Sequence, residues 1–310
     1  LDDWAYSGLP LFDLEVGLTR QITGLNYKIA SMMSVGLLQT ICDILFVYLI
    51  GRSILGEKGG LFAALLIGLA DQHLGLNWAP IATTMATTLM IMAVYLIIVR
   101  INEKKASFAY LLILSFIAVV LTHTMTALCL AIILLTFSIC LTIYGDRSGI
   151  SISAKSFRAI TIAFIFMMIG WWAVGSGQFS RIIYALKNVM GSGVPDNTVP
   201  VSPSPPGGVP GGDVPISPDP SIVFAYMNSL PISELIFQRL GMFIFFAIAV
   251  FGCLIVFSKS RDDIRRRSLA ISGMVILVIG FIPFASAMGV MHRWWYYAQL
   301  ILVPFVGMTI

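Results

Sequence analysis

The chain of 310 residues is 58% hydrophobic, only 11% charged, and carries a formal net charge of +4. Soluble domains contain about 25% charged residues, so this composition excludes a soluble globular protein and predicts an integral membrane protein. The positive charge is scattered over short loops between apolar runs, which excludes a nucleic-acid-binding surface. The four cysteines lie within apolar runs and are expected as small core residues, not as disulfides or metal ligands.

The first 28 residues are too polar to cross a bilayer, and they carry four acids. Apolar residues recur there at steps of three and four, which predicts an amphipathic helix lying along the membrane surface. The stripe consists of Leu11, Leu14, Leu18, Ile22 and Leu25. Asp2 and Asp3 precede this helix, at the expected water boundary. Taken alone, these residues favour an amphipathic segment that leads into the membrane, with acids that are simply solvated.

Membrane-spanning helices need about 20 apolar residues. Nine segments predict such helices, and the second is so short that we expect a broken or buried helix there. The segments cover residues 30–50, 60–70, 80–99, 107–121, 125–144, 159–174, 239–257, 268–290 and 295–310.

Four regions follow from this pattern. Residues 1–29 form an outer acidic loop and interfacial helix, and residues 30–175 form a six-span block. Residues 176–238 form a large outer loop with a second interfacial helix, and residues 239–310 form a three-span block. Within the loop, residues 191–220 are dominated by proline and glycine, which excludes a helix. The chain begins with Leu1, without a basic leader, and ends within an apolar run, so we expect a fragment with a further span upstream.

The basic residues predict the orientation. When alternate loops are assigned to opposite sides, 13 Lys and Arg residues fall on one side and 6 on the other. The side rich in positive charge is cytoplasmic, so the first stretch is expected to face outward from the plasma membrane.

All three histidines, His73, His123 and His292, fall at the outward ends of predicted spans. A buried polar group at such a place needs a hydrogen bond or a functional role. Asp43 is the one acid deep within a predicted span, and this suggests a proton or ion path, as in a transporter.

Common catalytic signatures are absent from the sequence. There is no P-loop, GxGxxG, GxSxG or HExxH motif, and no Cys/His spacing typical of zinc. The threonines of residues 83–88 predict close helix packing. The aromatic pairs at residues 171–172 and 294–297 predict belts at the outer interface.

Several segments, in this order, resemble the GT-C membrane glycosyltransferases, which include protein O-mannosyltransferases, aminoarabinose transferases and oligosaccharyltransferases. The segments are DDWAYSGLPLF, QITGL, YLIGRSILGEKGGLFAALLIGL, LADQHLGLNWAP, LTHTMTAL and MHRWWYYAQLILVPF. The resemblance covers most of the chain and rests on the order of these segments. It implies an all-α membrane fold of about nine transmembrane helices with interfacial helices.

In that family an acid of the first outer loop is catalytic, and the donor is a polyprenyl-phosphate sugar. The resemblance therefore implies that Asp2 and Asp3 are catalytic. The candidate substrate-binding residues are His73, His123, Arg181, His292 and Arg293. No metal ligands are predicted, although a divalent metal cofactor stays open. The expected partners are the lipid-linked sugar, membrane lipid and other membrane subunits, without nucleic acid.

The chain departs from the family pattern in three respects. The family's first span would precede Leu1, and Asp13 replaces a histidine expected after the Pro-Leu-Phe element. Beyond Asp2 and Asp3 the sequence shows no acidic pair that would bind a metal. Two alternatives to a glycosyltransferase therefore stay open, a non-catalytic membrane subunit with the same fold and a transporter.

Overall fold

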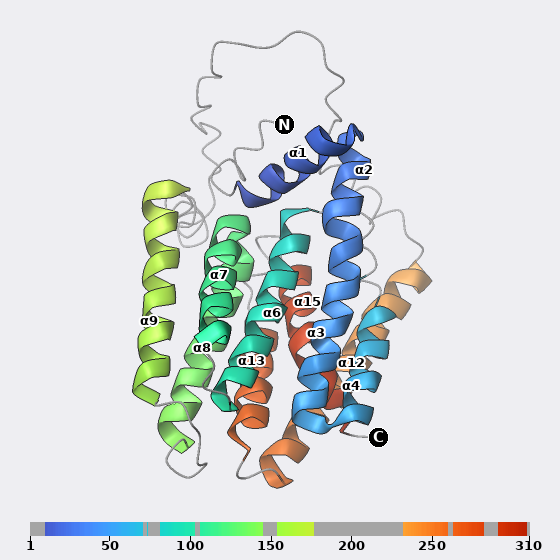
Figure 1. Ribbon diagram of the computed structural model, residues 1–310. Helices are drawn as coiled ribbons and strands as arrows, with labels where there is room; N and C mark the ends of the chain where they lie inside the picture. Colours follow the sequence, from blue (N-terminus) through green and yellow to red (C-terminus); the bar gives the residue numbers. More distant parts are fainter. Residues whose placement is uncertain are drawn as a thin grey trace, which may run out of the picture.

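The computed structural model describes residues 10–70, 73, 81–102, 106–144, 154–176, 232–259, 263–281 and 291–308, and all its elements in these ranges are helices (Figure 1). The first half contains α1 (Leu11–Thr23), α2 (Tyr27–Ser31), the π-helix η1 (Met32–Gly36), α3 (Leu37–Leu55), α4 (Glu57–Gly68) and α6 (Ala82–Asn102). Next come α7 (Ala106–Thr122), α8 (Thr124–Tyr144), α9 (Ala154–Gly170) and the π-helix η3 (Trp171–Gly175). The last three are α12 (Ile232–Lys259), α13 (Ile264–Gly280) and α15 (Met291–Val306).

Five described helices are long and apolar enough to cross a membrane, which confirms the prediction of an all-α membrane protein. They cover Tyr27–Leu55, Ala82–Val99, Thr124–Tyr144, Ala154–Gly175 and Leu240–Ser258. The other four predicted spans contain shorter described helices, with 12 residues in α4, 17 in α7, 17 in α13 and 16 in α15, and residues 282–290 lie outside the described part of the chain. Nine membrane-spanning helices therefore stay a prediction. Helix α4 is about 18 Å long, and position 73 is helical again, while residues 71–72 lie outside the described residues, so the broken or buried second span stays a prediction.

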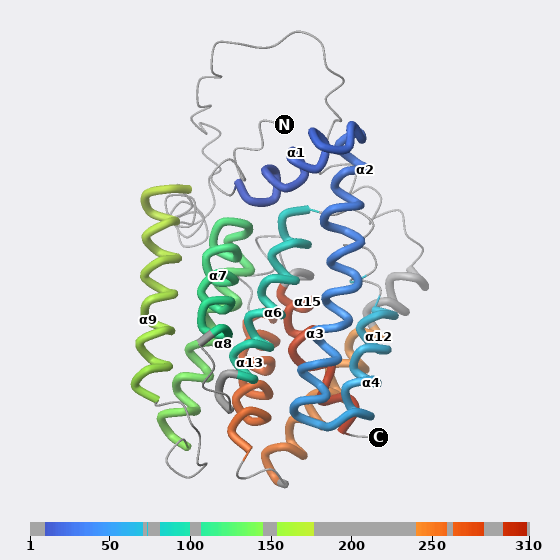
Figure 2. The backbone as a smooth tube through the Cα atoms, in the orientation of Figure 1, coloured from blue at the N-terminus to red at the C-terminus, as the bar shows by residue number. Residues whose placement is uncertain are grey.

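Helix α1 lies across one end of the bundle, at a large angle to the other helices (Figures 1 and 2). It ends at Gly24, whose φ of 70° places it in the left-handed region that glycine adopts without a steric penalty. Two residues later Asn26 caps the next helix, because its side chain accepts a hydrogen bond from the Ile29 N–H at 2.9 Å. This short turn converts a surface helix into a membrane span.

The predicted apolar stripe of α1 does not face the bundle. Leu14, Leu18 and Ile22 are 63%, 53% and 75% exposed. The residues that pack on the bundle are instead Phe12 and Val16, which contact a small apolar cluster beside the start of α6. One face of α1 is therefore held by protein, and the exposed stripe is free to enter the membrane interface.

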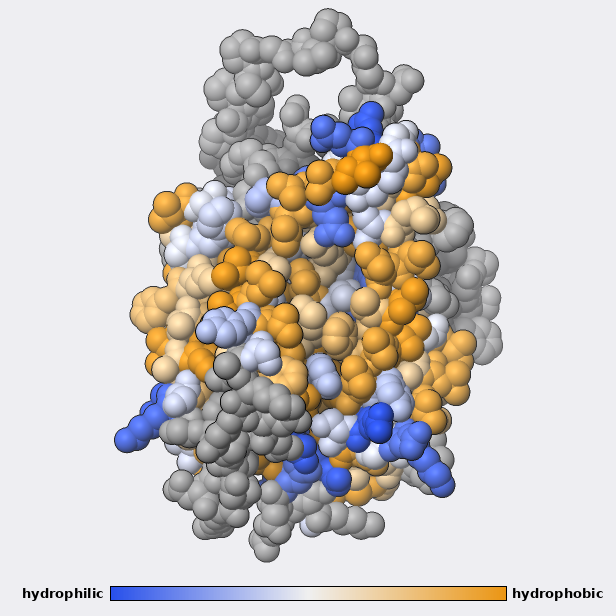
Figure 3. All heavy atoms as spheres, in the orientation of Figure 1, coloured by the Kyte–Doolittle hydropathy of each residue, from blue (hydrophilic) through white to orange (hydrophobic). Residues whose placement is uncertain are grey.

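The surface of the bundle has the polarity expected of a membrane protein. Figure 3 shows a broad hydrophobic belt between hydrophilic atoms near α1 and at the opposite end. Large apolar side chains on the spanning helices are exposed, such as Phe166 of α9 at 72% and Phe251 of α12 at 60%. The connection of α3 to α4 and the adjoining ends of α8, α9, α12 and α13 lie at the end away from α1 (Figure 1).

Helices α3 and α4 pack closely as an antiparallel pair. Gly56 turns the chain between them with a φ of 87°. A Cβ on Gly60 would lie only 2.7 Å from the Tyr48 carbonyl oxygen and 2.8 Å from the Arg52 nitrogen. Because both neighbours are backbone atoms, only glycine permits this approach. Because α4 packs antiparallel to α3, the chain after α4 returns toward the middle of α3, and His73 lies there beside Asp43.

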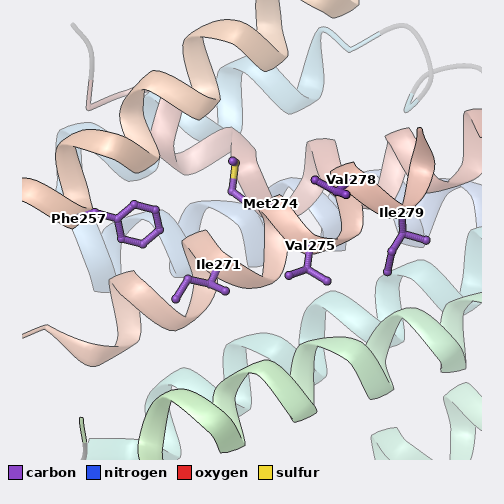
Figure 4. A pocket seen from close by; sticks show the side chains of 6 residues that line it. All are labelled: Phe257, Ile271, Met274, Val275, Val278 and Ile279. Atoms are coloured by element: carbon purple, nitrogen blue, oxygen red, sulfur yellow. The ribbon is translucent and has the colours of Figure 1, made fainter. Parts of the chain in front are cut away.

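A surface groove of about 380 Å³ runs along α13 (Figure 4). Five of its lining residues belong to α13, namely Ile271, Met274, Val275, Val278 and Ile279, and the sixth is Phe257 of α12. Among the described residues no polar side chain lines this groove, so this lining suits hydrocarbon chains and offers no group that would orient a sugar or phosphate. The candidate functional site therefore lies elsewhere.

Candidate functional site in the bundle interior

Two of the predicted substrate-binding residues, His73 and His123, belong to one buried set of polar side chains, which we call the polar network. It consists of Gln39, Asp43, His73, Thr83, His123, Thr126, Tyr296 and Tyr297. Every member is at most 3% exposed. The network joins α3, α6, α8 and α15, so it connects the first half of the chain to its last helix.

His123 is hydrogen-bonded at both ring nitrogens. Its Nε2 lies 2.9 Å from the Thr83 hydroxyl of α6, and its Nδ1 lies 3.0 Å from the Thr126 hydroxyl of α8. The Thr126 hydroxyl also pairs with the Tyr297 hydroxyl at 2.8 Å. The three helices α6, α8 and α15 are thus tied together through one imidazole, close to where α1 packs beside the start of α6. Thr83 was predicted as a helix-packing residue, and its hydroxyl in fact bonds His123.

His73 lies against Asp43 and Tyr296. Its Nδ1 is 3.0 Å from the Tyr296 hydroxyl and 3.8 Å from Oδ2 of Asp43. Burial lowers the pKa of His73, which follows α4 and lies outside the spanning helices, so its neutral form is favoured. The sequence offered no partner for Asp43, and the fold places this imidazole 3.8 Å from its carboxylate.

Helix α15 connects the two histidines. Tyr296 reaches His73 and its neighbour Tyr297 reaches Thr126, with the two tyrosine rings 6.4 Å apart between centroids. The prediction of an interfacial aromatic belt at residues 294–297 is wrong, because all four side chains are at most 3% exposed. An apolar run beside aromatic residues looks the same from the sequence whether it meets lipid or protein. The signal that could have identified the tyrosines is that a buried phenol needs a hydrogen-bond partner.

Three oxygens near Asp43 have no hydrogen-bond partner among the described residues. They are Oδ1 of Asp43, Oε1 of Gln39 and Oγ1 of Thr88, and each atom is inaccessible to solvent. Native structures leave few buried polar atoms in this state, so a cluster of three calls for an explanation.

The remaining predicted site residues lie outside the described part of the chain. For Asp2, Asp3 and Arg181 neither the backbone nor the side chain is described. The backbone of α15 includes His292 and Arg293, but their side chains are not described. The His73 group and the His123 group are linked through the adjacent tyrosines Tyr296 and Tyr297 of α15, and the predicted convergence of the site residues stays a prediction. The described residues contain no group of three or more His, Cys, Asp or Glu side chains that could hold a metal ion.

No protein-family model, curated protein or solved structure matches this chain. The fold and site therefore define a class, a helical membrane protein with a hydrogen-bonded polar network in its interior, and no relative supplies its activity.

Proposed function

We propose that this protein is a membrane glycosyltransferase that moves a sugar from a polyprenyl-phosphate donor to an acceptor on the outer face of the membrane. The observation that supports the proposal is the place of α1. This amphipathic helix lies across the end of the bundle, packs beside the start of α6, and follows directly on the segment with the two candidate catalytic acids. An interfacial helix at this position suits an enzyme whose donor lipid lies in the membrane and whose acceptor arrives from water.

The distance along the chain is compatible with this arrangement. From Asp3 to Leu11 there are eight residues, which reach at most about 28 Å when fully extended.

The proposed reaction is a displacement at the anomeric carbon of the donor sugar. The acceptor hydroxyl forms the new bond to that carbon, and the bond from the carbon to the lipid phosphate breaks. A carboxylate of Asp2 or Asp3 takes the acceptor proton as general base. The departing lipid phosphate is an anion, and Arg181 and Arg293 are the candidate cations that stabilise it.

In this proposal His73 and His123 are positioning residues. His73 is 0% exposed and His123 is 3% exposed, so neither side chain can contact a bulky sugar on the outer face directly. Their hydrogen bonds instead fix α6, α8 and α15 relative to one another. Helix α15 also carries Arg293 near its start, so the network sets the place of a candidate phosphate contact.

The test is a transfer assay in membranes with a labelled polyprenyl-phosphate sugar. The double variant Asp2→Asn, Asp3→Asn should abolish transfer while expression and membrane insertion stay at wild-type levels, because the amides are nearly isosteric. The matched control is Asp13→Asn, an exposed acid on α1 whose carboxylate accepts a 3.3 Å hydrogen bond from Tyr27, and it should retain transfer. Transfer that survives in the double variant would refute the assigned base. A wild-type protein that transfers no sugar would favour the non-catalytic subunit.

A further inference from the structure

We infer that Asp43, Gln39 and Thr88 form a binding site for a monovalent cation, Na⁺, in the interior of the bundle. This site is separate from the outer-face chemistry proposed above, and the inference does not depend on it. It rests on the three buried oxygens that have no partner within the described residues.

The two oxygens of the Asp43 carboxyl group differ in their surroundings. Oδ2 accepts a hydrogen bond from Nε2 of Gln39 at 3.1 Å and lies 3.8 Å from Nδ1 of His73. Oδ1 is buried and makes no hydrogen bond of acceptable geometry in the described part of the chain, while the Thr88 and Tyr296 hydroxyls lie beside the carboxyl group. The residue is 0% exposed, so water at the surface cannot solvate this oxygen.

Two further oxygens accompany the carboxylate. Gln39 precedes Asp43 by one turn of α3, and its amide nitrogen is directed at the carboxylate, which leaves Oε1 without a partner. Thr88 comes from α6, which packs against α3, and its hydroxyl faces the Asp43 carboxyl group. Its Oγ1 has no hydrogen bond of acceptable geometry. Two adjacent helices thus contribute one carboxylate, one amide and one hydroxyl oxygen.

Oxygens of these three kinds are the ligands that hard cations prefer. A buried acceptor without a donor destabilises the folded protein, and a buried unpaired charge does so more strongly, so a bound cation relieves both penalties together. One positive charge neutralises one carboxylate, whereas a divalent ion would leave an excess charge inside the bundle. We expect oxygens from one turn of α3 and from the packed helix α6 to favour Na⁺ over the larger K⁺, because selectivity among hard cations follows cavity size and ligand number.

The test is thermal unfolding of the full chain in lipid nanodiscs at pH 8, which keeps His73 neutral. NaCl is varied against choline chloride at constant ionic strength. We expect a saturable rise of Tm with Na⁺ and a smaller rise with K⁺. The variant Thr88→Val, which removes only the hydroxyl, should raise the half-saturating Na⁺ concentration by about tenfold or more, since even groups that merely support metal ligands contribute this much.

The matched control is Thr87→Val on the same helix. The Thr87 hydroxyl donates to the Thr83 carbonyl oxygen at 2.7 Å, so its loss leaves the three oxygens in place and should leave the Na⁺ response unchanged. Asp43→Asn should remove the response altogether. The inference is overturned if NaCl, KCl and choline chloride stabilise equally, as a site filled by water or by a proton on Asp43 would require. It is also overturned if the Thr88 and Thr87 variants respond to Na⁺ alike.

Discussion

Replacing Gly252 with alanine tests how α12 holds α15, the helix that carries Tyr296 and Tyr297. A Cβ at this position would overlap the carbonyl oxygen of Phe305 and lie 2.8 Å from its carbonyl carbon. A side chain could rotate away from such a contact, but these are backbone atoms of a buried helix. The two helices must therefore separate, and the polar network would shift with α15.

The expected cost follows from two opposing contributions. Overpacking of a well-packed interior costs about 1–3 kcal/mol. Alanine in a helix interior is favoured over glycine by about 0.5–1 kcal/mol, because glycine loses more backbone freedom on folding. The Gly252→Ala variant should thus lose stability overall, or at best keep it.

A matched control separates the two contributions. Gly241 lies on the same helix, is exposed, and has no atom within 4 Å of the added Cβ. The Gly241→Ala variant gains the helix preference without the overlap. The difference in unfolding free energy between the two variants therefore isolates the overlap, and it should be about 1–3 kcal/mol.

The assay is reversible denaturation of both variants in the same detergent, followed by the transfer assay at equal amounts of folded protein. We expect transfer to fall in the Gly252 variant and to persist in the Gly241 variant, because only the first displaces α15. Equal stability of the two variants would show that α12 and α15 do not approach as closely as described.

Two other predictions concern the ends of the bundle. Burial raises the pKa of the Glu15 carboxyl on α1, so the folded protein keeps this proton to a higher pH than the unfolded chain does. The stability of the fold therefore falls as the pH rises from the unfolded-state pKa through the folded-state pKa. Glu15→Gln should therefore be more stable than wild type at neutral pH, with a gap that closes as the pH falls through the raised pKa, and a gap independent of pH would contradict this. For the orientation, a cysteine at position 205 should react with an impermeant thiol reagent from outside and one at position 266 should not, and the reverse pattern would exclude an outward active face.

The sequence by itself determined the class of the protein and the course of its helices. The content of 58% hydrophobic residues and the length of the apolar runs predicted a helical membrane protein, because a backbone in lipid must satisfy its hydrogen bonds internally. The periodicity of residues 11–25 predicted α1 in the same way, and the described helix ends within two residues of that segment. These features depend on local composition, which the sequence contains in full.

Tertiary structure alone decided which side chains meet. The sequence singled out Asp43 and both histidines as polar groups that need partners, but it could not choose the partners. Tyr296 is 223 positions from the His73 it contacts, and its phenol lies within an aromatic run that also suits a lipid interface. Likewise the stripe of α1 predicted from periodicity is exposed, while Phe12 and Val16 are buried. Burial of a residue depends on the distant helix that packs against it, and no local pattern contains that information.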